Sequence, residues 1–214
     1  VILGITPTAS ALLATQLIRT CQDLYPDVSL NLFEGLSEEV MRRLSDNSLD
    51  MGFSYNPGAA KGVATEPLLT EALFLVGAPG AEDPGEKVSF REVCKRALIL
   101  PSRGFGLRDC VENAARDAET VLEIAFEIDS VATQRDLAES GLGFTILPYA
   151  AVRQSVEAGG LFAAQITRPQ ISRTLNIAYA ASHSANKATN AVRHVIDRVV
   201  SESIAESGGR LHKA

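Results

Sequence analysis

The polar side chains best suited to bind a ligand follow short apolar segments that have the character of strands. These groups are Thr6-Pro7-Thr8, Gly35-Leu36-Ser37, Pro101-Ser102-Arg103 and Asp129-Ser130. Each group precedes a predicted helix, and a helix N-terminus offers backbone N–H groups and a positive dipole end to an anion. Arg103 could add a bidentate donor for a carboxylate. The pattern therefore predicts a small-anion site, with ordinary helix capping by Thr8, Ser37 and Ser130 as the alternative.

The sequence offers little for catalysis, metal binding or cofactor binding. Its three histidines, His183, His194 and His212, fall in no HxxH or HExxH spacing. There is no G-x-S-x-G nucleophile motif and no phosphate-binding P-loop motif, and Gly104-Phe-Gly106 lacks the third glycine of a dinucleotide loop. We therefore expect a binding protein rather than an enzyme, without a metal or a cofactor.

The composition indicates a globular protein that does not itself bind nucleic acid. The chain has 214 residues, 46% of them hydrophobic, and a net charge of -6. Phosphate binding needs clustered basic side chains, and the longest basic run is Arg42-Arg43. Three scattered cysteines, Cys21, Cys94 and Cys110, favour reduced thiols in a cytoplasmic protein. No segment approaches the ~18 apolar residues of a membrane helix.

The first third of the chain has the pattern of alternating strands and helices. The expected strands are Val1–Ile5, Val28–Phe33 and Asp50–Ser54, and the expected helices are Ala9–Leu24 and a second one that starts at Ser37. In the first helix the apolar residues recur at helical spacing, and Pro26 follows its end. This β-α-β-α-β order implies a parallel sheet with right-handed crossovers.

A second α/β series begins near Ala97 and predicts a second half of similar construction. Its strands are expected at Ala97–Leu100, Leu122–Ile128 and Phe144–Leu147, and its helices at Leu107–Ala118 and from Ser130 to about Ser140. Two more apolar strands, Leu68–Gly77 and Thr174–Ala181, could pass between the halves. A long amphipathic helix over Asn186–Ile204 would complete the first half, and the Ser-Gly-Gly-Arg tail from Ser207 is expected to be disordered.

Several short segments, taken in order, resemble one family. They are Pro7-Thr8, Tyr25-Pro-Asp-Val-Ser-Leu30, Glu34-Gly35, Leu44-Ser-Asp-Asn-Ser-Leu-Asp-Met-Gly-Phe53, Leu100-Pro-Ser-Arg103, Gly106-Leu-Arg108, Asp129-Ser130 and Gly141-Leu-Gly-Phe-Thr-Ile-Leu-Pro148. In this order and spacing the chain resembles the effector-binding domain of the bacterial LysR-type transcriptional regulators, from about Val1 to about Val199.

The resemblance implies an α/β fold with two Rossmann-like subdomains joined by two crossover strands, similar to the type 2 periplasmic binding proteins. Subdomain I would be residues 1–75 and 177–206, subdomain II residues 76–176, and residues 207–214 a disordered tail. It also implies an N-terminal winged helix-turn-helix that binds DNA. That module is absent from this chain, which starts with valine rather than methionine and is therefore expected to be a fragment or a processed product.

The implied function is transcriptional control by a small effector, often a carboxylate, that enters a cleft between the subdomains of a homodimer or homotetramer. The ligand-binding residues carried over by the resemblance are Thr8, Ser37, Ser102, Arg103, Phe105, Ser130 and Thr145. Position 36 is leucine where many relatives have a small polar residue, and Gly104-Phe105 also departs from the usual sequence of its loop. The family's dimers would use helices near Ala9–Leu24 and Leu107–Ala118.

Two other functions compete with this interpretation. A solute-binding protein that serves a transporter has the same fold, although the chain opens without the basic segment and cleavage site of a signal peptide. An enzyme on a related two-lobed fold would need an acid, a base or a nucleophile in the cleft, and the sequence nominates none.

Overall fold

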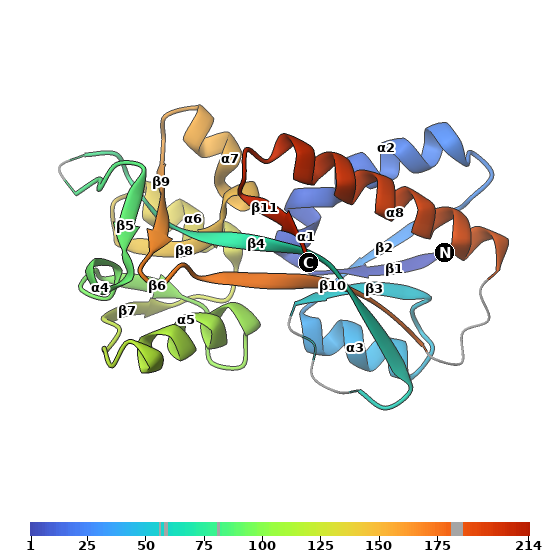
Figure 1. Cartoon of the computed structure of the whole chain (residues 1–214), viewed down its shortest axis with the longest axis horizontal. Helices are drawn as coiled ribbons and strands as arrows, with labels where there is room; N and C mark the ends of the chain where they lie inside the picture. The colour runs from blue at the N-terminus through green and yellow to red at the C-terminus, as the bar shows by residue number, and fades with distance from the viewer. Residues whose placement is uncertain (56, 58–59, 81, 181–185) are drawn as a thin grey trace. The chain divides into compact units, whose positions relative to one another are not determined.

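The computed structural model describes residues 1–55, 57, 60–80, 82–180 and 186–214, so that His183 lies outside the described part of the chain (Figure 1). The chain divides into unit 1, Val1–Glu71 with Thr174–Ala214, and unit 2, Ala72–Arg173. The sequence placed these changes of unit after residues 75 and 176, and the structure places them after residues 71 and 173.

Unit 1 is built on a sheet that is parallel at its centre. Its strands are β1 (Ile2–Ile5), β2 (Asn31–Glu34), β3 (Met51–Tyr55), β4 (Val63–Gly77), β10 (Ser172–Ala180) and β11 (Leu211–Lys213). Strand β1 lies parallel to β2 on one side and to β3 on the other, and β10 pairs antiparallel with β3. The β-α-β-α-β order expected from the sequence is therefore confirmed for the start of the chain.

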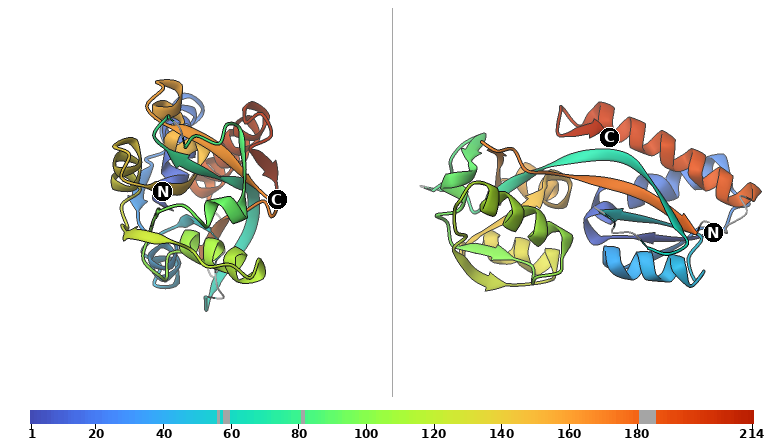
Figure 2. Two further views of the ribbon diagram at one scale, coloured as in Figure 1. Left: turned by 90° about the vertical axis from the view of Figure 1, so that its left-hand side faces the viewer. Right: turned by 60° about the horizontal axis from the view of Figure 1, so that its bottom comes forward.

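Helices cover both faces of this sheet (Figures 1 and 2). They are α1 (Pro7–Ala9), the π-helical turn η1 (Ser10–Ala14), α2 (Thr15–Leu24), α3 (Ser37–Ser45) and α8 (Lys187–Glu206). Helices α2 and α8 pack on one face, where Leu13, Leu17 and Ile196 are fully buried with the inward side chains of β1 and β3. Helix α3 packs on the other face, where Gly4 and Gly52 leave room for Val40.

Unit 2 repeats the alternation with additional elements. Its strands are β5 (Lys87–Ser89), β6 (Leu98–Leu100), β7 (Ile124–Glu127), β8 (Phe144–Pro148) and β9 (Phe162–Thr167), and its helices are α4 (Phe90–Val93), α5 (Gly106–Asp117), α6 (Val131–Glu139) and α7 (Tyr149–Glu157). Strand β6 is parallel to β7 and to β8, and the end of β4 pairs antiparallel with β8 and β9. Elements β5, α4, α7 and β9 were not predicted from the sequence.

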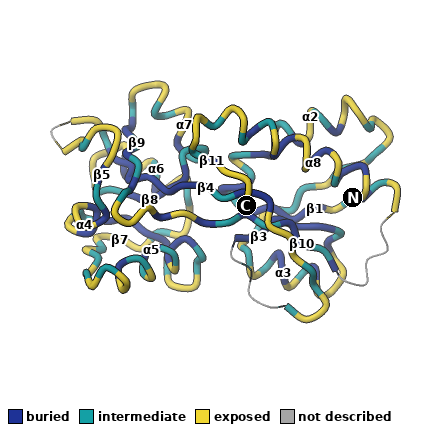
Figure 3. Tube along the Cα trace, viewed as in Figure 1, coloured by how far each residue is buried: buried dark blue, intermediate teal, exposed yellow. Residues whose placement is uncertain are grey.

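Strands β4 and β10 each contribute residues to both units, as expected for the two crossover strands. Each unit has its own buried core, and the inner strands of both are buried along most of their length (Figure 3). The mixed α/β fold class predicted from the sequence is thus confirmed.

The C-terminal segment is ordered, and the expectation of a disordered tail from residue 207 is wrong. Residues Leu211–Lys213 form β11, which pairs antiparallel with residues 69–71 of β4. Leu211 is buried, and its backbone N–H donates a hydrogen bond to the hydroxyl of Ser207 at 3.2 Å. A three-residue strand is stable here because both its backbone and one apolar side chain find partners in unit 1.

Candidate functional site

The carboxyl end of β1 leads directly into a continuous helical segment. The N-cap of this segment is Thr6, whose extended backbone (φ -84°, ψ 155°) is followed by Pro7 in the first helical position. Proline is favoured there because that position needs no N–H donor. Thr8 therefore lies inside the first turn, where it is buried, and the prediction that it caps this helix is wrong.

Two hydroxyls near this strand end lack a hydrogen-bond partner among the described residues. Thr6 Oγ1 and Ser54 Oγ are both buried in unit 1. Thr6 follows β1, and Ser54 lies near the end of the neighbouring β3. A buried hydroxyl is usually paired, so this end of the sheet has unused hydrogen-bonding capacity.

Ser37 lies at the start of α3, but it does not cap the helix as predicted. The N-cap is Leu36, whose apolar side chain cannot accept a hydrogen bond. The hydroxyl of Ser37 instead accepts a hydrogen bond from the backbone N–H of Tyr55 at 3.1 Å. It thereby fixes the start of α3 to the end of β3, and the first turn of α3 carries the acidic residues Glu38 and Glu39.

In unit 2 the loops after β6 and β7 are joined by a direct hydrogen bond. The backbone N–H of Ser102 donates to Oδ1 of Asp129 at 2.9 Å. Next to Asp129, Ser130 caps α6, and its hydroxyl accepts from the N–H of Thr133 at 3.3 Å. The predicted capping role of Ser130 is confirmed, and the structure brings Ser102 and Ser130 onto neighbouring loops.

Arg103 is strongly exposed, with 79% of its side chain accessible to solvent. Its Nε donates to Oε1 of Glu112 at 3.2 Å. A hydrogen bond from Arg108, with a weaker contribution from Arg103, holds the pKa of Glu112 below its usual range, so that this carboxylate is ionised at neutral pH. Phe105, the N-cap residue of α5, is half-buried in the same loop.

Thr145 is fully buried in β8, where its hydroxyl is part of a local network. Thr145 Oγ1 donates to Oε1 of Gln134 at 2.9 Å. Gln134 in turn donates from Nε2 to the backbone oxygen of Ile128 at 2.7 Å. The hydroxyl predicted to contact a ligand thus supports, through Gln134, the loop that carries Ser130.

Sequence reasoning missed the two buried polar side chains that hold these loops, Arg108 and Gln134. Arg108 is only 2% exposed, and its guanidinium donates to Pro101, Glu112 and Glu127. The periodicity of α5 held a signal for this: Arg108 stands three residues before Val111, on the buried face of the helix. A cation at an apolar position of an amphipathic helix indicates an internal partner.

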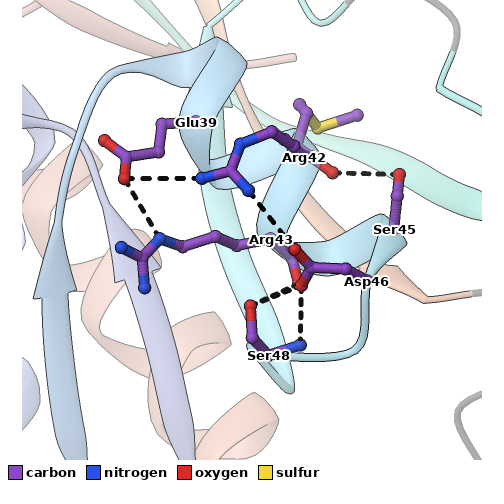
Figure 4. A network of polar contacts seen from close by, with 7 residues as sticks. Glu39, Arg42, Arg43, Ser45, Asp46 and Ser48 are labelled. Atoms are coloured by element: carbon purple, nitrogen blue, oxygen red, sulfur yellow. Dashed lines mark hydrogen bonds and ion pairs between the residues drawn. The ribbon is translucent and has the colours of Figure 1, made fainter.

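The Arg42-Arg43 run on α3 is bound by acidic side chains of the same helix region (Figure 4). Arg42 contacts Glu39 at 3.8 Å and Asp46 at 3.4 Å, and Nε of Arg43 donates to Glu39 at 3.1 Å. The Arg43 guanidinium also stacks over the Phe33 ring at 3.8 Å. Paired in this way, the two arginines make a poor surface for nucleic-acid phosphates.

The cysteines behave as the sequence analysis expected. Cys21, Cys94 and Cys110 are free thiols. Burial raises the pKa of the Cys21 and Cys94 thiols, so neither has the thiolate character of a reactive cysteine. No helix in the described part of the chain is long and apolar enough to cross a lipid bilayer.

Comparisons with known proteins identify relatives of this architecture. A family model described as "LysR substrate binding domain" matches residues 1–201. The nitrogen assimilation regulatory protein nac of Escherichia coli is 28% identical over 205 residues, which are 95% of this chain and 67% of nac. The regulator BbuR of Bordetella bronchiseptica is 28% identical over 209 residues, or 96% of this chain and 63% of BbuR.

Solved structures share the fold. The effector binding domain of QuiR in complex with shikimate superposes with a TM-score of 0.81 at 16% identity, covering 94% of this chain and 97% of that domain. At identities this low the similarity concerns the fold alone. Against the curated relatives the chain spans about two thirds of their length.

Proposed function

Because the chain belongs to the LysR substrate-binding domain family, we propose that it is the effector-sensing part of a transcription regulator and that its effector is a small carboxylate. The observation that carries the proposal of a carboxylate is the exposed guanidinium of Arg103 on the hydroxyl-bearing loops of unit 2. Arg103 uses one N–H on Glu112 among the described residues, and a guanidinium has five. The remaining donors suit a planar carboxylate.

The names of the relatives, and the ligand of one solved structure, support this proposal. The nac and BbuR proteins are named as regulators rather than enzymes, and the QuiR domain of the same fold was solved with shikimate, an organic anion. We therefore propose a non-enzymatic role in the bacterial cytoplasm. DNA would be bound by a separate N-terminal winged helix-turn-helix, and the regulator would act as a homodimer or homotetramer.

The predicted ligand-binding residues remain Thr8 and Ser37 in unit 1, with the other five in unit 2. Those five are Ser102, Arg103, Phe105, Ser130 and Thr145. An effector changes transcription only if it binds one conformation of the regulator more tightly than another. A tenfold preference corresponds to about 1.4 kcal/mol, which is the energy of one hydrogen bond to a charged group.

A thermal-shift screen of the intact regulator with small carboxylates tests this function, with the amides of the same acids as neutral controls. An effector at a hundred times its dissociation constant adds about 2.7 kcal/mol to stability, or roughly 5–10 °C for a chain of this size. The same effector should change affinity for the operator DNA. A broad metabolite screen that changes neither stability nor DNA affinity would contradict effector sensing.

A matched pair of variants tests the role of Arg103. Arg103→Gln should weaken carboxylate binding about tenfold or more, because it removes a charge-assisted hydrogen bond. Arg153→Gln removes an exposed arginine on α7 of the same unit and should leave affinity unchanged. Equal effects of both variants would show that only the general charge matters. The codons before Val1 give a separate test, since a signal peptide there would favour the solute-binding alternative.

A further inference from the structure

A buried cation occupies an unfavourable place in α5. Arg108 is the third residue of this helix and only 2% exposed. A positive side chain in the first turn opposes the helix dipole, and burying a charge costs free energy unless it is paired and hydrogen-bonded. An apolar residue would satisfy the helix and the core without these costs, so the reason for arginine lies in what the guanidinium contacts.

The guanidinium binds the ends of two neighbouring strands. Nη1 donates to the backbone oxygen of Pro101 at 2.9 Å, immediately after β6, and to Oε1 of Glu127 at 3.1 Å, the last residue of β7. Nε donates to Oε1 of Glu112 at 2.8 Å, one turn further along α5. A single side chain is therefore bonded to the residue after β6 and to the last residue of β7, the paired strands from which the Ser102 and Ser130 loops begin.

These contacts fix the relative position of the chain segments that follow β6 and β7. Pro101 precedes Ser102, and Glu127 precedes Ile128, whose N–H donates to the Leu100 oxygen at 2.9 Å. A flat guanidinium sets the directions of its hydrogen bonds as well as their lengths. Its two carboxylate partners also balance the buried charge, which a lone carbonyl could not do.

We propose that Arg108 is a positioning residue that fixes the spacing of the loops after β6 and β7 and so orders the donors of Ser102 and Ser130. This inference rests on the proposed function only in that those loops bind the effector. The order of the loops is itself a property of the protein without ligand.

Gln134 supports the same loops from α6. It holds the Ile128 oxygen at 2.7 Å, while the hydrogen bond from the Ser102 N–H to Asp129 closes the gap between the loops. Arg108 donates to the backbone oxygen of Pro101 after β6 in the same way. A buried side chain therefore donates a hydrogen bond to a backbone oxygen at the end of each of the two strands. These two backbone oxygens are thereby engaged inside unit 2.

Amide hydrogen exchange of the full 214-residue chain tests the proposal without ligand. In Arg108→Leu the amides of Ser102 and Ile128 should exchange about tenfold faster or more, the change expected from losing hydrogen bonds to a charged group. The amides of Leu75 and Ile146 in β4 and β8 report global unfolding and should change less than about threefold, because local opening leaves the core closed.

Two further variants keep the result interpretable. Arg96→Leu removes a half-buried arginine of the same unit that pairs with Glu82 at 2.7 Å away from these loops, and it should leave the Ser102 amide unchanged. Arg108→Lys keeps the charge but not the flat guanidinium, so its Ser102 amide should exchange at a rate between those of the parental chain and Arg108→Leu. This variant can be compared with the parental chain even if Arg108→Leu does not fold. The proposal is wrong if Arg108→Lys leaves the Ser102 amide at the parental rate, or if all four amides accelerate equally. If the exchange pattern is as expected but small carboxylates change neither the stability nor the DNA affinity of the intact regulator, the proposed function is contradicted and the positioning role of Arg108 stands.

Discussion

Replacing Thr145 by valine removes one buried hydroxyl and leaves the volume of the side chain almost unchanged. Both residues are β-branched and suit the strand β8 equally. The structure attributes to this hydroxyl one hydrogen bond, from Oγ1 to Oε1 of Gln134 at 2.9 Å, at a position with no solvent exposure. The variant therefore measures one internal contact with little disturbance of packing.

The expected cost follows from the burial of both partners, since Gln134 is 1% exposed. Losing a buried hydrogen bond and leaving its acceptor unsatisfied costs about 1–3 kcal/mol. The additional methyl group of valine returns roughly 0.8 kcal/mol of apolar burial. We expect Thr145→Val to lower the free energy of unfolding by about 0.2–2 kcal/mol, or to lower the Tm by up to about 8 °C.

A double-mutant cycle with Gln134→Leu isolates the contact, measured by urea unfolding. The coupling between the two changes should be about 1 kcal/mol or more, because each single variant already breaks the same bond. Thr167→Val in β9 is the matched control. Its hydroxyl donates to the Val88 oxygen at 3.0 Å, so it should be additive with Gln134→Leu within about 0.5 kcal/mol. A coupling of Thr145 with Gln134 below that limit would refute the network.

Three further predictions concern other parts of the chain. Gly143→Ala should destabilise by about 1–3 kcal/mol in thermal unfolding, because a Cβ would lie 2.7 Å from a backbone oxygen, whereas Gly141→Ala has open space and should lose only about 1–2 kcal/mol through its positive φ. Arg108 lowers the pKa of Glu112 in the folded state, so the ionised Glu112 contributes to the stability of the folded chain. This contribution is complete above the ordinary glutamate pKa and is lost as the pH falls through the lowered pKa. Glu112→Gln should flatten that part of the stability–pH curve, and a curve equal to the parental one would contradict the contact. Deleting residues 208–214 removes β11 and its buried Leu211 and should cost about 1.5–3 kcal/mol on urea unfolding, whereas a mobile tail would cost nothing.

Helix starts show how far local sequence carries a prediction. The cap at Ser130 was predictable because the hydroxyl and the N–H of Thr133 are three residues apart. The start at Thr6 was also present in the sequence, since a proline in the first helical position places the cap one residue earlier. Ser37 was not predictable as a non-capping residue, because the N–H that binds its hydroxyl belongs to Tyr55.

The sequence by itself determined the alternation of strands and helices, the two crossover strands and the family, because periodicity and short motifs are local properties of the chain. The tertiary structure alone decided which polar side chains are buried and what they bind. Arg108 reaches Glu127, and Asp129 reaches the N–H of Ser102, across the pairing of β6 with β7. The register of that pairing depends on the packing of the whole unit, and the hydrogen-bond partner of a buried group is fixed only when that packing forms.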